Sequence, residues 1–241
     1  MAAVIPYDGK DPLKYLYATA HQLHRQMGLD VIVVDTGFHL YPPYVKRIRQ
    51  KTPGVAGARY DGFTYALKAG YDCIINSDSH LIFLDDITKL CRTSTWSSTY
   101  HHPHLLGFAL PIKIYSSYIA VKNEVLTWCS VVNHRPDHIV MTNEPLYAVR
   151  RHVLEDIVHW WARYTTYALD NIGLLFAPEG EIIEAPYIHI GPLDRGKPTR
   201  RKPSKEEAER FKKEVWPRVA EKIRSFESST PPQARVCLPL E

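Results

Sequence analysis

The chain has 241 residues, of which 45% are hydrophobic and 23% are charged, and its net charge is +4 at neutral pH. A chain of this length and composition can bury a full core, so we expect a globular protein with one large domain, or one domain and a tail. Its apolar runs fall short of the roughly 20 residues that cross a bilayer, which excludes a membrane-spanning helix and predicts a soluble protein.

The N-terminal sequence MAAVIPYD lacks the basic start and the long apolar middle of a signal peptide, so we expect the protein in the cytoplasm. Its four cysteines, Cys73, Cys91, Cys129 and Cys237, are widely spaced and include no C-x-x-C pair. This spacing argues against a zinc site and gives no disulfide framework. We therefore expect reduced thiols.

The first two elements are a short strand at residues 2–6 and a helix over 11–28. Asp11 is the expected N-cap of this helix, Pro12 takes its first position, and Gly28 ends it. The apolar residues within this segment recur on one face of the helix, as in a helix that covers a sheet.

The chain then continues to alternate strands with helices. We expect an apolar strand at residues 30–37 that includes Asp35, followed by a short helix at 42–51 that begins with prolines. A second helix is expected at 61–70 and the next strand at 73–77. Strands that are apolar throughout and alternate with helices predict a parallel sheet covered on both faces.

The middle of the chain is less regular, and its patterns predict short elements. We expect a bent strand at 105–115, a helix at 116–132, a strand at 138–142, one long or two short helices at 150–173, and two short β-segments at 174–180 and 181–191.

The C-terminal part predicts an amphipathic helix over 204–227. Ser204 and Glu207 form a capping box, and Pro217 is expected to kink the helix. Its apolar face most simply docks on its own domain, with a membrane-surface or partner helix as the alternative. The basic, proline-rich stretch at 193–205 before it is typical of a solvated linker.

Acidic residues follow three of the predicted strands: Asp8 soon after the first, Asp35 at the end of the second, and Asp78 after the strand at 73–77. In parallel sheets, ligands bind outside the carboxyl ends of the strands. We therefore expect one crevice to collect these acids.

Asp78 and His80 lie two residues apart where the chain leaves its strand, so both can reach one divalent ion; Asn76 with Asp78 is an alternative pair. Oxygen ligands with one imidazole favour manganese-like ions without excluding magnesium. Such an ion suits a nucleotide diphosphate, whose charge it neutralises in the leaving group. The simpler interpretation of Asp78-Ser79-His80 is a polar turn after a strand.

The strings VIPYDG, VIVVDTG and AGARYDGFTYALKAGYDCIINSDSH, in this order, resemble the nucleotide-binding half of family 2 and related GT-A fold glycosyltransferases. Those enzymes carry an Asp-x-Asp strand end, and the polypeptide N-acetylgalactosaminyltransferases use Asp-x-His there, as in Asp78-Ser79-His80. The resemblance implies a GT-A (Rossmann-like) α/β domain at 1–192 with a mostly parallel mixed sheet. Its nucleotide-binding half is 1–90 and its acceptor-side half 91–192, and the basic loop and C-terminal helix occupy 193–241.

The resemblance also implies a donor site. The closing segment of such enzymes supplies a metal-ligating His, here His189, so Asp78, His80 and His189 would hold manganese or magnesium. Asp35 would bind the base or ribose, Asp8 the base pocket, and Arg59 the base or pyrophosphate. The full set of implied donor-binding residues is Pro6, Asp8, Asp35, Arg59, Asn76, Ser77 and Asp78, with Arg195 and Arg200 of the basic loop, beside Lys197 and Arg201, closing over the diphosphate.

The sequence departs from the family where a catalytic base is expected. Inverting members carry an acidic pair shortly before the glycine aligned with Gly173, whereas this chain has Trp160-Trp161-Ala162-Arg163. Either a displaced acid acts as the base, or the enzyme is retaining and the leaving phosphate accepts the proton. We expect at least one of the two tryptophans to be core and the other to line the acceptor site. The candidate bases are Glu155, Asp156 and Asp170, with Glu144 as a further acid.

We therefore expect a metal-dependent hexosyltransferase that moves a sugar from a UDP- or GDP-sugar to a glycan, protein or small-molecule acceptor. We expect no nucleic-acid partner and at most peripheral membrane contact through the basic tail. One alternative is a sugar-nucleotide nucleotidyltransferase, although PYDGKDPLK lacks the glycine-rich basic loop typical of those enzymes. A second is a non-catalytic nucleotide- or carbohydrate-binding protein. A rival metal site at His101, His102 and His104 lacks a companion acid or cysteine.

Overall fold

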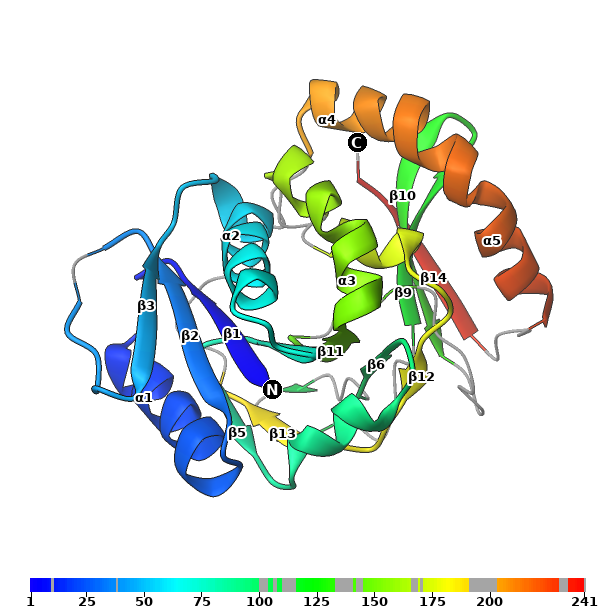
Figure 1. Ribbon diagram of the computed structural model, residues 1–241. Coiled ribbons are helices and arrows are strands. Elements are labelled where there is room, and N and C mark those ends of the chain that lie inside the picture. Colours follow the sequence, from blue (N-terminus) through cyan, green and yellow to red (C-terminus); the bar gives the residue numbers. More distant parts are fainter. Residues whose placement is uncertain are drawn as a thin grey trace.

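The architecture comes from a computed structural model, shown in Figure 1. The structure describes residues 1–9, 11–37, 39–99, 104–105, 108–109, 116–132, 141, 145–165, 169, 171–190, 203–229 and 234–240. Among these residues, no helix is both long and apolar enough to cross a bilayer.

A seven-stranded sheet forms the centre of the molecule. In spatial order its strands are β12 (Glu181–Ile182), β6 (Trp96–Ser98), β11 (Leu146–Arg150), β4 (Cys73–Ser77), β1 (Ala2–Tyr7), β2 (Asp30–Asp35) and β3 (Val45–Arg49). All neighbouring pairs are parallel except the two that involve β11. The mostly parallel mixed sheet predicted from the sequence is confirmed.

Helices cover both faces of this sheet, as predicted. One face packs against α1 (Leu13–His21), its π-helical continuation η1 (Gln22–Gln26) and the 3-10 helix η2 (Ile87–Arg92). The other face packs against α2 (Gly54–Lys68), α3 (Arg151–Ile157) and the 3-10 helices η3 (Val158–Arg163) and η5 (Ile172–Phe176). The side chains of β1 alternate between these two cores, as the period of a strand requires.

A glycine lets the α2 helix pack closely on the sheet. A Cβ atom on Gly62 would lie 2.4 Å from Cγ1 of Val4 and 2.9 Å from Cγ2 of Val34. The absence of a side chain at this position therefore lets α2 pack directly on β1 and β2. The helix begins at Gly54, earlier than the start near Asp61 that the sequence predicted.

Three predicted elements are wrong. Residues 45–49, expected within a short helix, form the edge strand β3, because they pair in parallel with β2. Residues 116–132, expected as a helix, form the hairpin of β9 (Ser116–Lys122) and β10 (Val125–Val132). Residues 172–176 form the 3-10 helix η5 where a β-segment was expected from 174 onward.

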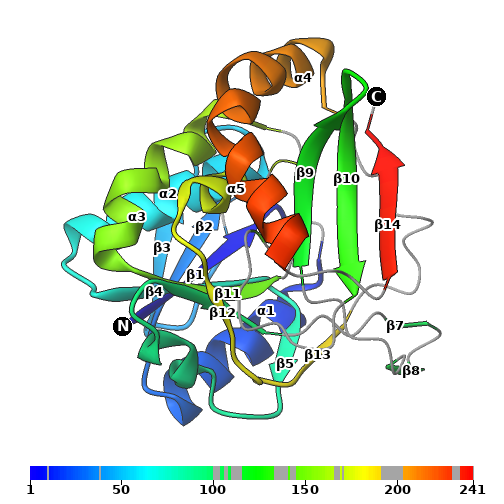
Figure 2. The same cartoon turned by 90° about the vertical axis from the view of Figure 1, so that its right-hand side faces the viewer.

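The hairpin belongs to a second, three-stranded antiparallel sheet with the order β14-β10-β9, where β14 is Ala234–Pro239. Figure 2 shows these strands beside the central domain. The tight turn of the β9–β10 hairpin consists of Asn123 and Glu124, with φ of 49° and 62°. Two consecutive residues with positive φ are what a two-residue type I′ hairpin turn requires.

Small antiparallel ladders complete the described strands. β5 (Leu81–Phe83) pairs with β13 (Tyr187–His189), which lies inside the β-segment predicted at 181–191. β7 (His104–Leu105) pairs with β8 (Phe108–Ala109).

The C-terminal helix docks on its own domain. It runs through α4 (Lys205–Arg210), the π-helical η6 (Phe211–Val215) and α5 (Trp216–Ser229), and its apolar face joins the same core as α2 and α3. Just before Pro217, the Trp216 amide donates to the Phe211 carbonyl, five residues back, so the helix passes the proline through a π-turn.

The predicted capping box at the start of α4 is present. The Ser204 hydroxyl accepts from the Glu207 amide (3.1 Å), and the Glu207 carboxylate accepts from the Ser204 amide (3.3 Å). The same carboxylate also accepts from the amide (2.6 Å) and the hydroxyl (3.0 Å) of Thr165. Glu207 therefore ties the C-terminal helix to the segment that follows η3.

The prediction of reduced thiols is wrong, since the structure contains the disulfides Cys73–Cys91 and Cys129–Cys237. The first joins the start of β4 to η2, and the second joins directly opposed residues of β10 and β14. Disulfides persist in oxidising compartments and also in intracellular proteins of hyperthermophiles, so they leave the expected compartment undecided.

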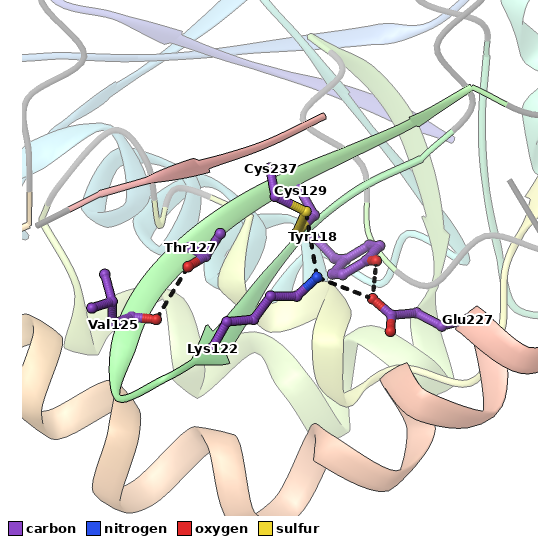
Figure 3. Close-up of a disulfide and its surroundings, with 7 residues drawn as sticks. All are labelled: Tyr118, Lys122, Val125, Thr127, Cys129, Glu227 and Cys237. Atoms are coloured by element: carbon purple, nitrogen blue, oxygen red, sulfur yellow. Dashed lines mark hydrogen bonds and ion pairs between the residues drawn. A yellow bond between two sulfur atoms is a disulfide. The ribbon is translucent and has the colours of Figure 1, made fainter. Parts of the chain in front are cut away.

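The second disulfide lies beside a small polar cluster that connects the three-stranded sheet to α5 (Figure 3). The Lys122 ammonium lies 3.5 Å from the Cys237 sulfur and 4.0 Å from the Glu227 carboxylate, which also accepts from the Tyr118 hydroxyl. Glu227 belongs to α5, so one carboxylate links that helix to β9.

Candidate metal-binding site

Asp78, His80 and His189 meet at the carboxyl edge of the parallel sheet. Asp78 follows β4 directly, and His80 lies just before β5. His189 is brought there by the β5–β13 ladder, in which it pairs with Leu81, and by the Ile190 amide, which donates to the His80 carbonyl (2.9 Å). The structure therefore unites residues that are more than a hundred positions apart in sequence.

The potential ligand atoms of these three residues all lie within 4.8 Å of one another, and each residue is partly buried. Ligand atoms bound at about 2.1 Å to a shared ion lie at most about 4.2 Å apart, so a small side-chain rotation suffices for common ligation. One carboxylate and two imidazoles are a donor set that suits manganese and other first-row divalent ions.

The two imidazoles face each other closely. Their Nε2 atoms are 2.6 Å apart, and their rings stack with centroids 4.6 Å apart and planes 12° from parallel. Two lone pairs at this separation repel unless a proton or a metal cation lies between them. The pair therefore creates a place that favours positive charge.

Helix α1 and η1 fix the segment that carries His80. Oγ1 of the buried Thr19 lies 3.2 and 2.9 Å from the carbonyl oxygens of Ser79 and Leu81, and it accepts from the Leu81 amide (3.2 Å). The Gln22 side chain donates to the Phe83 carbonyl (3.1 Å) and accepts from the Phe83 amide (3.0 Å). The side chains of Thr19 and Gln22 thus bind the backbone groups along one edge of β5, and β13 pairs with its other edge.

Asp11 is not the N-cap that the sequence predicted. The cap position of α1 is Pro12, and no side chain makes the capping hydrogen bond. The Asp11 carboxylate instead turns toward the site, where its Oδ2 lies 3.0 Å from His80 Nδ1 and accepts from the Ser79 hydroxyl (3.1 Å). This is a site residue that the sequence analysis assigned to another role.

Arg59 lies behind Asp78, on α2. The residue is 2% exposed, its Nε donates to Asn76 Oδ1 (2.9 Å), and its Nη2 lies 3.7 Å from Asp78 Oδ1. The Asn76 amide nitrogen donates to the Pro145 carbonyl (3.1 Å), so both polar atoms of Asn76 bind protein groups. Asn76 therefore supports Arg59, and the structure does not favour it over His80 as the partner of Asp78. The Ser77 hydroxyl donates to the Asp78 carbonyl (3.0 Å).

The buried carboxylate of Asp35 is the centre of a partly exposed polar cluster at the end of β2. Its carboxylate accepts from Arg47 Nε (2.9 Å) and from the Tyr41 hydroxyl, and it lies 3.4 Å from His39 Nδ1. Burial, followed by the hydrogen bond to Asp35, strongly raises the pKa of Tyr41, so this phenol stays protonated. His39 also contacts Tyr7 edge to face, with ring centroids 5.4 Å apart. None of these partners was expected from the sequence.

The remaining predicted donor residues lie on or just after β1. Pro6 pairs with Val34 within the sheet, Tyr7 pairs with Asp35, and Asp8 is exposed just beyond. Burial, with Asp11 and Asp8 as the next causes, raises the pKa of Tyr7. Asp8, Asp35 and Asp78 thus follow three adjacent parallel strands, the arrangement that the sequence predicted.

The candidate bases Glu155 and Asp156 are exposed residues of α3. This helix begins at the opposite, amino edge of the sheet, where Arg150 pairs with Cys73 and the Arg151 amide donates to the Asp72 carbonyl. Glu155 is ion-paired with Arg151 (2.8 Å). The described structure therefore does not bring these acids to Asp78, and their catalytic role stays a prediction.

The tryptophan prediction needs correction. Trp160 is 3% exposed and Trp161 is fully buried, and Trp160 stacks on Phe176 with ring centroids 3.8 Å apart. Both rings therefore belong to the core. The remaining candidates, Asp170, Glu144, Arg195, Lys197, Arg200, Arg201, His101 and His102, lie outside the described residues, and only the backbone of His104 is described, in β7.

One known protein shares substantial sequence identity with this chain. The "Uncharacterized 26.8 kDa protein" of Thermoproteus tenax virus 1 (strain KRA1) is 32% identical over 217 residues, which cover 88% of this chain and 89% of the viral protein. This chain belongs to the family of that viral protein. The name of the viral member of the family states no activity. No protein-family model matches the chain.

Several solved structures resemble the fold of this chain, with low TM-scores. A197 from STIV gives a TM-score of 0.46 at 11% identity, covering 80% of this chain and 87% of A197. UDP-glucose pyrophosphorylase from Acinetobacter baumanii gives 0.43 at 11% identity, covering 77% and 87%. Mannose-1-phosphate geranyltransferase from Thermus thermophilus gives 0.42 at 10% identity, covering 77% and 75%. Scores this low support no inference about function.

Proposed function

We propose that the protein is a divalent-cation-dependent glycosyltransferase that transfers a sugar from a nucleotide-diphosphate sugar to a glycan, protein or small-molecule acceptor. The observation that carries the proposal is the convergence of Asp78, His80 and His189 at the carboxyl edge of the parallel sheet. This edge is where open α/β sheets bind their ligands.

The donor set fits the proposed cation. Asp78 supplies a carboxylate oxygen, and His80 and His189 supply facing imidazole nitrogens, so a manganese-like ion keeps further positions for phosphate oxygens and water. When bound, the cation supplies Lewis-acid stabilisation of the departing nucleotide diphosphate.

The residues around the cation ligands serve the same chemistry. Arg59 is a buried positive charge 3.7 Å from Asp78, so it restrains the carboxylate and adds positive potential on the diphosphate side. Two strands along the sheet from β4, at the end of β2, Asp35 orients Tyr41 and His39, which we assign to the nucleoside pocket. The acceptor's proton goes either to a residue not yet identified or to the leaving phosphate itself.

The proposal is tested by nucleotide release. The protein is incubated with Mn²⁺ and a panel of UDP-, GDP- and dTDP-sugars, and released nucleotide is measured with and without candidate acceptors. We expect release from at least one donor, a loss of at least about 100-fold in Asp78→Asn and His189→Ala, and full activity in His152→Ala, whose exposed histidine is on α3.

Two results would overturn the proposal. Formation of a nucleoside triphosphate and a sugar 1-phosphate, only when pyrophosphate is supplied, would assign the protein to the nucleotidyltransferases. Tight donor binding without turnover on any acceptor would assign it to non-catalytic binding proteins.

A further inference from the structure

We propose that Asp11 is a positioning residue that holds His80 in the tautomer with its proton on Nδ1, so that the lone pair of Nε2 faces Asp78 and His189. The inference rests on the proposed function for its purpose, because a cation ligand must present a lone pair. It assigns to Asp11 a role that neither its place at the helix start nor the Asp-x-His pattern indicates.

The geometry around the His80 ring carries this inference. Asp11 Oδ2 lies 3.0 Å from Nδ1, on one side of the ring, and His189 Nε2 lies 2.6 Å from Nε2, on the other. A carboxylate accepts hydrogen bonds and never donates them when ionised, so it favours the proton on the nitrogen that it faces. Because neutral imidazole carries only one such proton, Nε2 is left with its lone pair.

The surroundings of Asp11 hold its carboxylate in this position. The residue is 9% exposed, its Oδ2 also accepts from the Ser79 hydroxyl (3.1 Å), and its backbone carbonyl accepts from the Tyr7 hydroxyl (2.6 Å). Ser79 is in turn fixed by Thr19 of α1. A carboxylate anchored at both its side chain and its backbone orients an imidazole more firmly than a mobile surface acid does.

The same arrangement recurs in metal sites, where a ligating histidine donates its second ring N–H to a carboxylate. Loss of such a carboxylate typically lowers metal affinity by about 10- to 100-fold. For His80, removal of the acceptor leaves the ring free to rotate and to move its proton to Nε2, which then cannot bind a cation.

The test compares Asp11→Ala and Asp11→Asn with the wild-type protein by two measurements. The first is the nitrogen chemical shifts of the imidazoles in ¹⁵N-labelled protein without added metal, with His80 assigned through His80→Gln. The second is Mn²⁺ affinity, measured from the free-ion signal in electron paramagnetic resonance. Asp30→Asn is the matched control, because Asp30 is an exposed carboxylate at the amino edge of the sheet that accepts one hydrogen bond, from Tyr71 (2.9 Å).

We expect the Nδ1–H form of His80 in the wild type and a shift toward the Nε2–H form in Asp11→Ala. Mn²⁺ affinity should fall by about 10- to 100-fold in Asp11→Ala and by less in Asp11→Asn, whose amide oxygen still accepts from Nδ1. Asp11→Asn also supplies the answer if the alanine variant does not fold.

An unchanged tautomer together with Mn²⁺ affinity within about twofold of the wild type in the Asp11 variants would overturn the role of Asp11. Failure of the wild type to bind Mn²⁺ would instead refute the proposed function. In that case the tautomer measurement still decides whether Asp11 orients His80, so the two failures are distinguishable.

Discussion

The disulfide between Cys129 and Cys237 should dominate the stability of the three-stranded sheet. It closes a loop with a sequence separation of 108, against 18 for the disulfide between Cys73 and Cys91. In the chain-entropy treatment, cross-links of these lengths restrict the unfolded chain enough to stabilise the fold by about 5 and about 3 kcal/mol.

The structure indicates where the loss is felt. β14 pairs with β10 through a six-residue ladder at the edge of its sheet, and Cys129 and Cys237 face each other within that ladder. We expect Cys129→Ala/Cys237→Ala to lower the free energy of unfolding by several kcal/mol, and by more than Cys73→Ala/Cys91→Ala does. Amide exchange should quicken first in β14.

The assay is denaturant unfolding followed by circular dichroism, with hydrogen exchange to locate the change. Reduction of the wild-type protein is the control that breaks the cross-links without removing any atoms. The reasoning is refuted if the Cys129/Cys237 double variant unfolds within about 1 kcal/mol of the wild type, or if the short-loop variant is the less stable of the two.

Three further changes test the packing of the molecule. Burial lowers the pKa of Lys222 to about 8 from 10.5, so the unfolded state binds more protons between these values and stability rises with pH there. Between pH 8 and pH 10.5, the free energy of unfolding of the wild type should rise by up to about 3 kcal/mol relative to that of Lys222→Met. If the difference between the two proteins does not change with pH, the lowered pKa of a buried Lys222 is contradicted. Gly62→Ala should destabilise by about 1–3 kcal/mol in chemical denaturation because its Cβ would overlap a buried valine of β1; equal or higher stability would disprove the close approach. Glu207→Ala should lower the free energy of unfolding by about 1–3 kcal/mol, because it removes the capping box and the hydrogen bonds to Thr165. Glu206→Ala removes an exposed acid of the same turn and should cost little. Equal losses in the two variants would show that the Glu207 hydrogen bonds do not stabilise the protein.

The nucleotide-side half of the fold could be predicted because its signals are local and agree with one another. The apolar run that forms β2, the glycine that ends the first helix, and the strand before Asp78 each indicate their element unaided. The carboxyl ends of parallel strands lie at one edge, so the position of Asp8, Asp35 and Asp78 at that edge could also be predicted from the sequence.

The errors lie where long-range pairing overrides a local pattern. Residues 45–49 begin after two prolines, which favour a helix start, yet pairing with β2 makes them a strand. The β9–β10 hairpin turns at Asn123 and Glu124. Glu124 has a positive φ at a position where such turns usually carry glycine, so the sequence lacks the usual signal of a hairpin. Cysteine spacing alone cannot show which thiols meet across a sheet.

At the candidate site, the sequence predicted the residues that the structure brings together but not their support. Asp78 and His80 stood out as metal-binding residue types at a strand end, and the family resemblance implied His189. Asp11 did not stand out, because an acid before a proline at a helix start has a more common local role as an N-cap. Only the tertiary fold, which places α1 against Ser79 and His80, shows where its carboxylate lies.

The central claim concerns a single cation held by side chains from β4, its following turn and β13. A crystal of the protein soaked in Mn²⁺ and measured at the manganese absorption edge tests it directly. We expect one anomalous peak about 2 Å from an Asp78 carboxylate oxygen and from Nε2 of His80 and His189. Anomalous density at other residues, or none at this edge of the sheet at millimolar Mn²⁺, would contradict the account.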